Sequence, residues 1–62
     1  MKYTINDRVK ILEGREYANG DSIKAGTEGT ITVVYVLYEA YLVIFEGAKI
    51  GHRVLEKHLE EA

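Results

Sequence analysis

The chain has 62 residues, with ten Asp and Glu against eight Lys and Arg and a formal net charge of −2. This length predicts one domain, spanning residues 1–62, and a domain so small buries only about 60% of the surface that its unfolded chain exposes. The absence of Cys excludes disulfide bonds and thiolate metal sites. No window approaches the roughly 18 apolar residues of a membrane span, and the N-terminal stretch lacks the layout of a signal peptide, so we expect a cytoplasmic protein.

The first part of the chain predicts one strand followed by a long loop. Residues 1–6 are a short lead-in that forms either an edge strand or packed irregular chain. Residues 7–13 alternate apolar with charged side chains, which is typical of a half-buried strand. Residues 14–25 are polar and contain Asn19-Gly20, a strong turn signal, so we expect a long loop that folds back on itself.

Residues 30–38 and 41–46 are dense in Val, Ile, Thr, Tyr and Phe, which predicts a central hairpin of two long strands. If Glu39-Ala40 is its loop, one face is shared by three pairs: Tyr38 with Tyr41, Val36 with Val43, and Val34 with Phe45. The opposite face then carries Val33, Tyr35, Leu37, Leu42 and Ile44. Glu39-Ala40 lacks the glycine chemistry of two-residue turns, so a slip by one residue, which exchanges the two faces, stays open. In either register both faces are apolar, whereas a hairpin with one solvated face should alternate.

The end of the chain predicts a turn at residues 47–51, a short strand at 52–55 and a tail with two interpretations. The tail forms either one tight helical turn that leads to a last short strand, or a short helix that buries Val54, Leu55, His58 and Leu59. We favour the turn and strand, because a helix of that length is marginal without packing.

Four segments carry a resemblance to small SH3-like and KOW-type domains: Val-Lys-Ile-Leu at 9–12, Gly-Thr-Glu-Gly-Thr-Ile at 26–31, Tyr-Leu-Val-Ile-Phe-Glu at 41–46 and Val-Leu-Glu-Lys-His-Leu at 54–59. The chain also resembles short SH3-like proteins of bacteria and their phages. The resemblance implies an all-β fold, a small five-stranded SH3-like barrel with a long loop after strand 1 and a helical turn before the last strand. In such a barrel, Gly29, Ile31 and Val34 indicate a bulge in the second strand. The interior would then hold Val9, Ile11, Ile31, Val34, Val36, Val43 and Phe45.

We find no pattern that predicts an enzyme, a cofactor or a metal site. Ser22 is the only serine and lies in a turn-rich loop, away from any nucleophile-elbow setting. His52 and His58 have no carboxylate at metal-site spacing, so we expect a surface His52 and a partly packed His58. Gly-Thr-Glu-Gly at 26–29 lacks the Gly-Lys-Ser/Thr of a phosphate loop.

The outer apolar row of the hairpin is the feature that most favours a function. We predict a protein-binding site there, for another protein or for a second copy of the chain, with a further contact from the long loop; its residues are Tyr35, Leu37, Leu42, Ile44 and Tyr17. The alternative within the chain is that the N-terminal segment or the long loop covers this row.

Nucleic-acid binding is the alternative function, because SH3-like and KOW-type domains often bind nucleic acid and exposed tyrosines can stack on bases. The candidate residues are Arg8, Lys10, Arg15, Lys24, Lys49 and Arg53. The net negative charge and the neighbouring glutamates argue against a polyphosphate partner.

Overall fold

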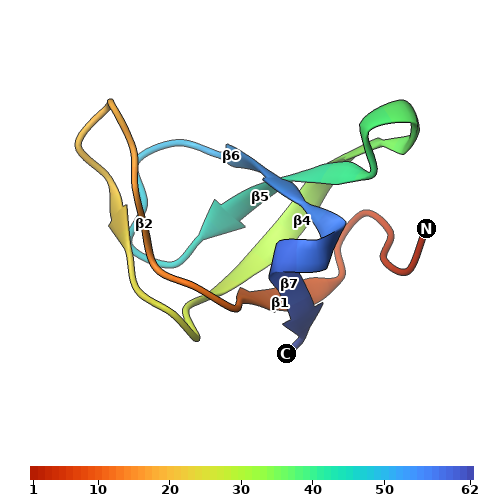
Figure 1. Cartoon of the computed structure of the whole chain (residues 1–62), viewed down its shortest axis with the longest axis horizontal. Helices are drawn as coiled ribbons and strands as arrows, with labels where there is room; N and C mark the ends of the chain where they lie inside the picture. Colours follow the sequence, from red (N-terminus) through yellow and green to blue (C-terminus); the bar gives the residue numbers. More distant parts are fainter.

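The computed structural model describes residues 1–62 and consists of strands and turns without an α-helix (Figure 1). The strands are β1 (Arg8–Ile11), β2 (Arg15–Glu16), β3 (Ser22–Ile23), β4 (Glu28–Tyr35), β5 (Ala40–Phe45), β6 (His52–Leu55) and β7 (Leu59–Glu61). Two single 3₁₀ turns, η1 (Val36–Tyr38) and η2 (Glu56–His58), join β4 to β5 and β6 to β7. The chain has no helix with the length and apolar character to cross a membrane. An all-β fold is therefore confirmed.

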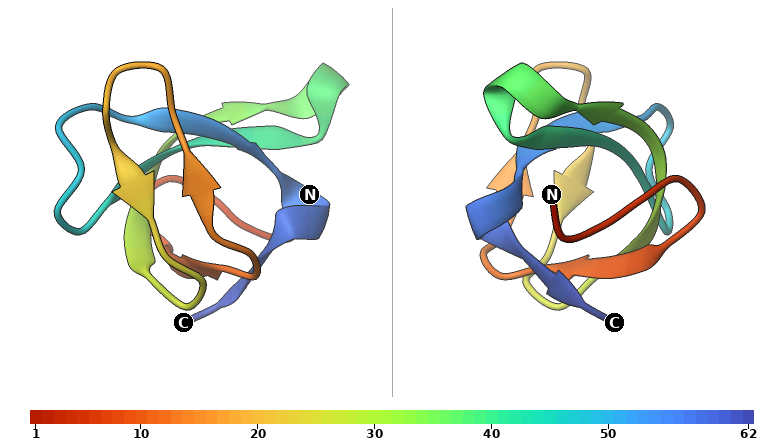
Figure 2. Two further views of the ribbon diagram at one scale, coloured as in Figure 1. Left: turned by 60° about the vertical axis from the view of Figure 1, so that its left-hand side comes forward. Right: turned by 90° about the vertical axis from the view of Figure 1, so that its right-hand side faces the viewer.

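Five of the strands form one antiparallel sheet in the order β6-β5-β4-β1-β7. The sheet curls strongly, so that its two ends approach each other across the core (Figure 2). Because β6 and β7 are its two edges and are not paired with each other, the sheet is open rather than closed.

The long loop after β1 folds back on itself as predicted, with β2 and β3 paired as a small separate hairpin. In Figure 2 (left) this hairpin lies across one end of the curled sheet. The N-terminal segment lies at the opposite end, where the Tyr3 ring packs edge-to-face on Tyr41 with centroids 5.6 Å apart (Figure 2, right). The Lys2 amide donates to the Glu56 carboxylate at 2.9 Å, which fixes this segment to η2.

The predicted register of the central hairpin is wrong. Val34 pairs with Tyr41 rather than with Phe45, and β4 ends at Tyr35 because the next three residues form η1. Glu39 closes that turn in the left-handed conformation (φ 50°), and its amide donates to the carbonyl of Val36 at 3.2 Å. The connection thus uses four residues instead of two, and Val36 and Tyr38 are 65% and 66% exposed rather than in the core.

The predicted bulge in this hairpin is confirmed. The register of β4 against β5 shifts between Ile31 and Val33. The Thr32 hydroxyl at the bulge donates to the carbonyl of Leu42 at 3.2 Å. The extra residue turns Ile31 and Val34 inward and Val33 outward, which restores the predicted inner and outer sides of the strand despite the wrong register.

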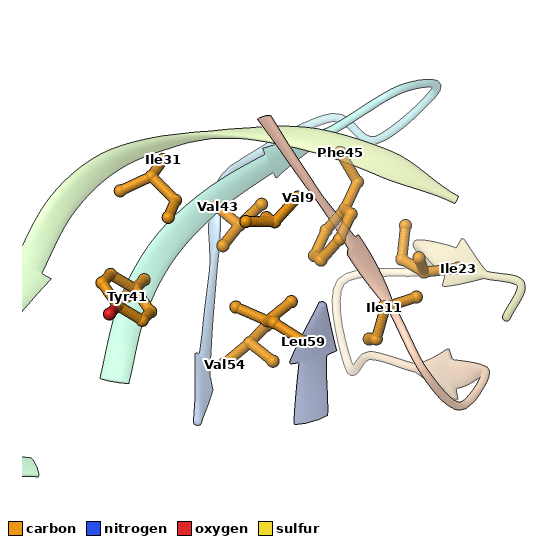
Figure 3. Close-up of a cluster of buried hydrophobic side chains, with 9 residues drawn as sticks. All are labelled: Val9, Ile11, Ile23, Ile31, Tyr41, Val43, Phe45, Val54 and Leu59. Carbon is orange, nitrogen blue, oxygen red and sulfur yellow. The ribbon is translucent and has the colours of Figure 1, made fainter. Parts of the chain in front are cut away.

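The core lies inside the curl of the sheet and is built from every strand except β2 (Figure 3). Its nine residues are Val9, Ile11, Ile23, Ile31, Tyr41, Val43, Phe45, Val54 and Leu59. Of the predicted interior, only Val36 is outside, and Val34 is half-buried against the cluster. The favoured interpretation of the tail is confirmed, since η2 leads into β7 and Leu59 pairs with Ile11 of β1.

Candidate protein-interaction surface

The outward side of the sheet is apolar over β4, β5 and β6 near the hairpin, and past Ile44 it continues into Thr30 and the ion pairs of Arg8 with Glu28 and Glu46. Along β5 the side chains alternate, with Tyr41, Val43 and Phe45 in the core. The register places Leu42 between Val33 and Arg53, and Ala40 between Tyr35 and Leu55. We call this apolar part the outer face; its residues are Val33, Tyr35, Ala40, Leu42, Ile44, Arg53 and Leu55, of which Ala40 is 0% exposed.

The outer face continues into the tip of the hairpin, which projects from the rest of the molecule (Figure 1). Leu37 was predicted within the outer strand row but lies in η1, where it is 94% exposed. Ile44 is 49% exposed, and Tyr35 and Leu42 are half-buried. The outer face and the three residues of η1 are called the outer surface below.

Neither segment that could cover the outer surface within the chain does so. The N-terminal segment packs on the core side, where the Tyr41 hydroxyl accepts from the Tyr3 amide at 3.0 Å. The long loop inserts Ile23 into the core cluster at the other end. Leu37 and Ile44 therefore remain in contact with water in the single chain.

The structure does not bring Tyr17 to the outer surface. Its ring stacks on His52, with centroids 3.6 Å apart and planes 12° apart. Burial raises the pKa of the Tyr17 hydroxyl, which has no hydrogen-bond partner. Tyr17 therefore anchors the β2–β3 hairpin to β6.

His52 was predicted at the surface but is only 6% exposed, because it has a buried partner. Its Nε2 lies 2.7 Å from a carboxylate oxygen of Asp21, itself 5% exposed. The same carboxylate accepts from Asn19 Nδ2 at 3.0 Å and from the Lys49 amide at 3.0 Å. These hydrogen bonds, from Asn19 first and His52 second, hold the pKa of Asp21 far below its ordinary value of 3.8. An ionised carboxylate only accepts, so His52 donates, and the cluster ties the long loop to the β5–β6 turn.

The depressed pKa of Asp21 predicts an acid-sensitive contribution to stability. Its contribution is fully present above pH 3.8, the ordinary value, and is lost as the pH falls below it, because the unfolded chain then binds a proton that the folded chain does not. We expect the urea midpoint of unfolding to fall as the pH drops from 5 toward 2. The Asp21→Asn variant should start from a lower midpoint at pH 7 and lose less on acidification, as followed by circular dichroism. Parallel wild-type and variant profiles would contradict this role.

The structure does not gather the predicted nucleic-acid residues into one patch. Arg8 donates to Glu28 at 3.1 Å and binds Glu46, and these two carboxylates raise the pKa of Arg8. Lys10 lies 3.6 Å from Glu60, and Arg15 Nη2 lies 2.6 Å from His58 Nδ1. The three others are exposed and without a carboxylate partner: Lys24, Lys49 and Arg53.

No group of three or more His, Cys, Asp or Glu side chains is arranged to hold a metal ion. The sequence interpretation placed Arg53 only among the nucleic-acid candidates and missed its position on the outer face. The alternation of β6, in which His52 and Val54 are buried while Arg53 and Leu55 are exposed, was the signal that could have placed it.

No family model matches the chain, and neither the curated proteins nor the solved structures contain a match. The resemblance to SH3-like domains therefore stays a prediction, and the outer surface is the feature of the structure that favours a function.

Proposed function

We propose that this chain is a small cytoplasmic SH3-like barrel that acts as a non-enzymatic protein-interaction or assembly module, binding another protein or a second copy through its outer surface. The barrel assignment is supported by the strand order, the folded-back loop after β1 and the 3₁₀ turn before β7. Because this fold hosts many functions, the functional part rests on the surface and not on the fold.

The observation that carries the proposal is the exposure of large apolar side chains on one continuous surface. The solvent-accessible area is 4094 Å², close to the roughly 4,000 Å² expected for a folded monomer of 7.0 kDa. The chain as a whole is therefore as compact as a typical folded monomer of its size. Burying one large apolar side chain is worth roughly 1.5–3 kcal/mol, so a partner that covers Leu37 and Ile44 gains a substantial driving force.

The composition of the outer surface also favours protein binding. Tyr, Leu and Arg side chains meet there, and Tyr and Arg are enriched among the residues that dominate binding energy in protein interfaces. Charged residues are depleted at the centre of such interfaces, and Arg53 is the only charged residue of the outer face.

The double substitution Leu37→Lys and Ile44→Lys tests the proposal. Both side chains are exposed, so the fold should survive while two charges in the contact area abolish association. Self-association is measured by sedimentation equilibrium over a wide concentration range, and binding of other proteins by comparing what wild type and variant retain from extracts of the source cells. The fold is checked by circular dichroism.

Ile5→Lys is the matched control, because Ile5 is 54% exposed and lies in the N-terminal segment, off the outer surface. We expect this variant to behave as wild type in both assays. Equal binding by wild type and the double variant would overturn the proposal, and so would unfolding of the double variant, which would place Leu37 or Ile44 in the core.

Nucleic-acid binding is the second candidate, and one observation favours it. The Arg53 guanidinium lies 5.8 Å from the ring centroids of both Tyr35 and Tyr38, and an arginine beside aromatic rings can also bind a phosphate and stack on bases. The pairing of Arg8 and Lys10 with carboxylates weakens this candidate, because those charges are no longer free for phosphates.

A further inference from the structure

Arg53 is the one charged residue of the outer face; it lies on the edge strand β6, with two aromatic rings near its guanidinium. The carbon at the centre of the guanidinium lies 5.8 Å from the ring centroids of Tyr35 and Tyr38, within the range of cation–π attraction. The side chain of Arg53 is exposed. The two rings therefore favour a position of the guanidinium beside them.

The other two arginines of the chain have hydrogen-bond partners, whereas Arg53 has none. Arg8 contacts Glu28 and Glu46, and Arg15 contacts His58. Arg53 makes no side-chain hydrogen bond and no ion pair. Its five N–H donors are thus satisfied by water alone in the free protein.

A partner that covers the outer surface also removes water from the charged guanidinium of Arg53. If a wholly apolar segment covered Leu42, Leu55 and Arg53 together, it would strip water from an unpaired guanidinium, which is strongly unfavourable. A carboxylate removes that penalty, because it accepts two parallel N–H bonds from the planar guanidinium. Because neither tyrosine contact is a hydrogen bond, the N–H groups of Arg53 remain available to such an acceptor.

We propose that the outer surface binds an apolar segment of another protein that carries one Asp or Glu, and that this carboxylate pairs with Arg53 between Tyr35 and Tyr38. The inference rests on the proposed interaction function and specifies the chemistry of the partner. Leu37 and Ile44 provide apolar contact at either end, and Arg53 sets the position of the acidic residue between them.

Charge complementarity favours a different protein over a second copy. The seven residues of the outer face include one arginine and no acidic residue, and the glutamates farther along the same side of the sheet, Glu28 and Glu46, bind Arg8. In a face-to-face dimer about a two-fold axis, each Arg53 would lie opposite the same seven residues, which include no carboxylate. The cost of an unpaired buried charge would then be incurred twice.

The test is a selection of random short peptides, displayed on phage, for binding to the full chain. We expect the selected peptides to be apolar and to share an Asp or Glu. Changing that residue to Asn or Gln should weaken binding to wild type by about tenfold or more, as expected for a lost charged hydrogen-bond pair. The same change should have little effect on binding to Arg53→Gln, which should itself bind about tenfold more weakly.

Lys24→Gln is the matched control, because it removes one positive charge from an exposed side chain of the long loop, away from the outer surface. Arg53→Lys separates charge from geometry and should recover only part of the affinity, since an ammonium cannot bind a carboxylate through two parallel bonds. Affinities are measured by isothermal titration calorimetry at one salt concentration.

Two results would overturn this inference and leave the proposed function standing. In both, the Leu37→Lys variant of the chain no longer binds the selected peptides; in the first the peptides contain no Asp or Glu, and in the second they bind the Arg53→Gln variant as well as wild type. Selection of no peptide, or only of peptides indifferent to both substitutions, would overturn both. If sedimentation equilibrium shows a dimer that Leu37→Lys dissociates, the outer surface binds a second copy of the chain instead of another protein, and the inference is overturned. Binding of single-stranded RNA that requires Arg53 and weakens steeply with salt would identify a nucleic-acid surface instead.

Discussion

Replacing Phe45 by alanine is expected to lower the free energy of unfolding by about 3–5 kcal/mol, the range for large aromatic deletions in cores. Phe45 is 2% exposed and lies in the core cluster with Val43 (Figure 3). A domain of 62 residues has a total stability of roughly 3–9 kcal/mol. The variant should therefore be partly or largely unfolded at 25 °C, as read from urea titrations followed by far-ultraviolet circular dichroism.

Ile44→Ala is the control for this substitution, because Ile44 is the neighbour on the same strand with its side chain on the opposite face. Ile44 is 49% exposed, so we expect a loss below about 1 kcal/mol. If Ile44→Ala destabilised the protein more than Phe45→Ala, Ile44 would be the buried side chain and Phe45 the exposed one. The outer surface would then lie on the other side of the sheet.

The second large effect is expected at Gly29, where alanine should cost about 1–3 kcal/mol or more through overpacking. A Cβ at this position would lie 2.7 Å from Val43 Cγ1 and 2.8 Å from the Ile44 carbonyl oxygen. The side chain could adjust, but the carbonyl belongs to the β4–β5 pairing, where Gly29 is opposite Phe45. At a site whose backbone conformation suits alanine, Gly→Ala usually raises the free energy of unfolding, because it restricts the unfolded chain. At Gly29 we expect the opposite, a lower free energy of unfolding.

Gly51→Ala is the matched control for this effect. Its Cβ would lie 3.2 Å from Leu42 Cγ, which belongs to a half-buried side chain on the outer face. Leu42 can move by a few tenths of an ångström into solvent, so we expect a change below about 1 kcal/mol. Thermal unfolding of both variants side by side measures the difference. Equal melting temperatures would show that the β4–β5 pairing gives way easily at Gly29.

Strand composition and glycine positions were enough to predict the elements that position the outer surface. The density of β-branched residues on either side of Glu39 indicated the hairpin, and Gly29 with Ile31 indicated the bulge. These features are local, because pleated-strand preference and tight backbone approach depend on a few neighbouring residues.

The tip of the hairpin could not be predicted from the same signals. Val36, Leu37 and Tyr38 have strand-forming side chains, yet they form a 3₁₀ turn that Glu39 closes in a left-handed conformation. The pairing of Ala40 with Leu55 fixes where β5 begins, and the connection adapts to it. Tertiary pairing thus overrides the local preference, which is why the predicted register was wrong while most inward-facing residues were correct.

The burial of His52 depends on a residue far away in the chain. Asp21 precedes it by 31 positions and lies in a loop that the sequence marks only as polar and turn-rich. A histidine flanked by Gly51 and Arg53 is predicted to be exposed unless its hydrogen bond to Asp21 is known. For the same reason, the sequence could list Arg53 as a basic residue but could not reveal its two tyrosine neighbours.

The pairing of β1 with β7 determines when the protein can assemble during its synthesis. β1 comes from residues 8–11, whereas the strand that completes its second edge comes from residues 59–61. While the chain is still attached to the ribosome and its last strand is held in the exit tunnel, β1 has a free edge and Ile11 lacks its partner Leu59. Sheets built from such distant segments fold in milliseconds to seconds, and the domain can complete its fold only once residues 59–61 have left the exit tunnel. Until then, the exposed edge and the apolar tip of the hairpin are both available to chaperones.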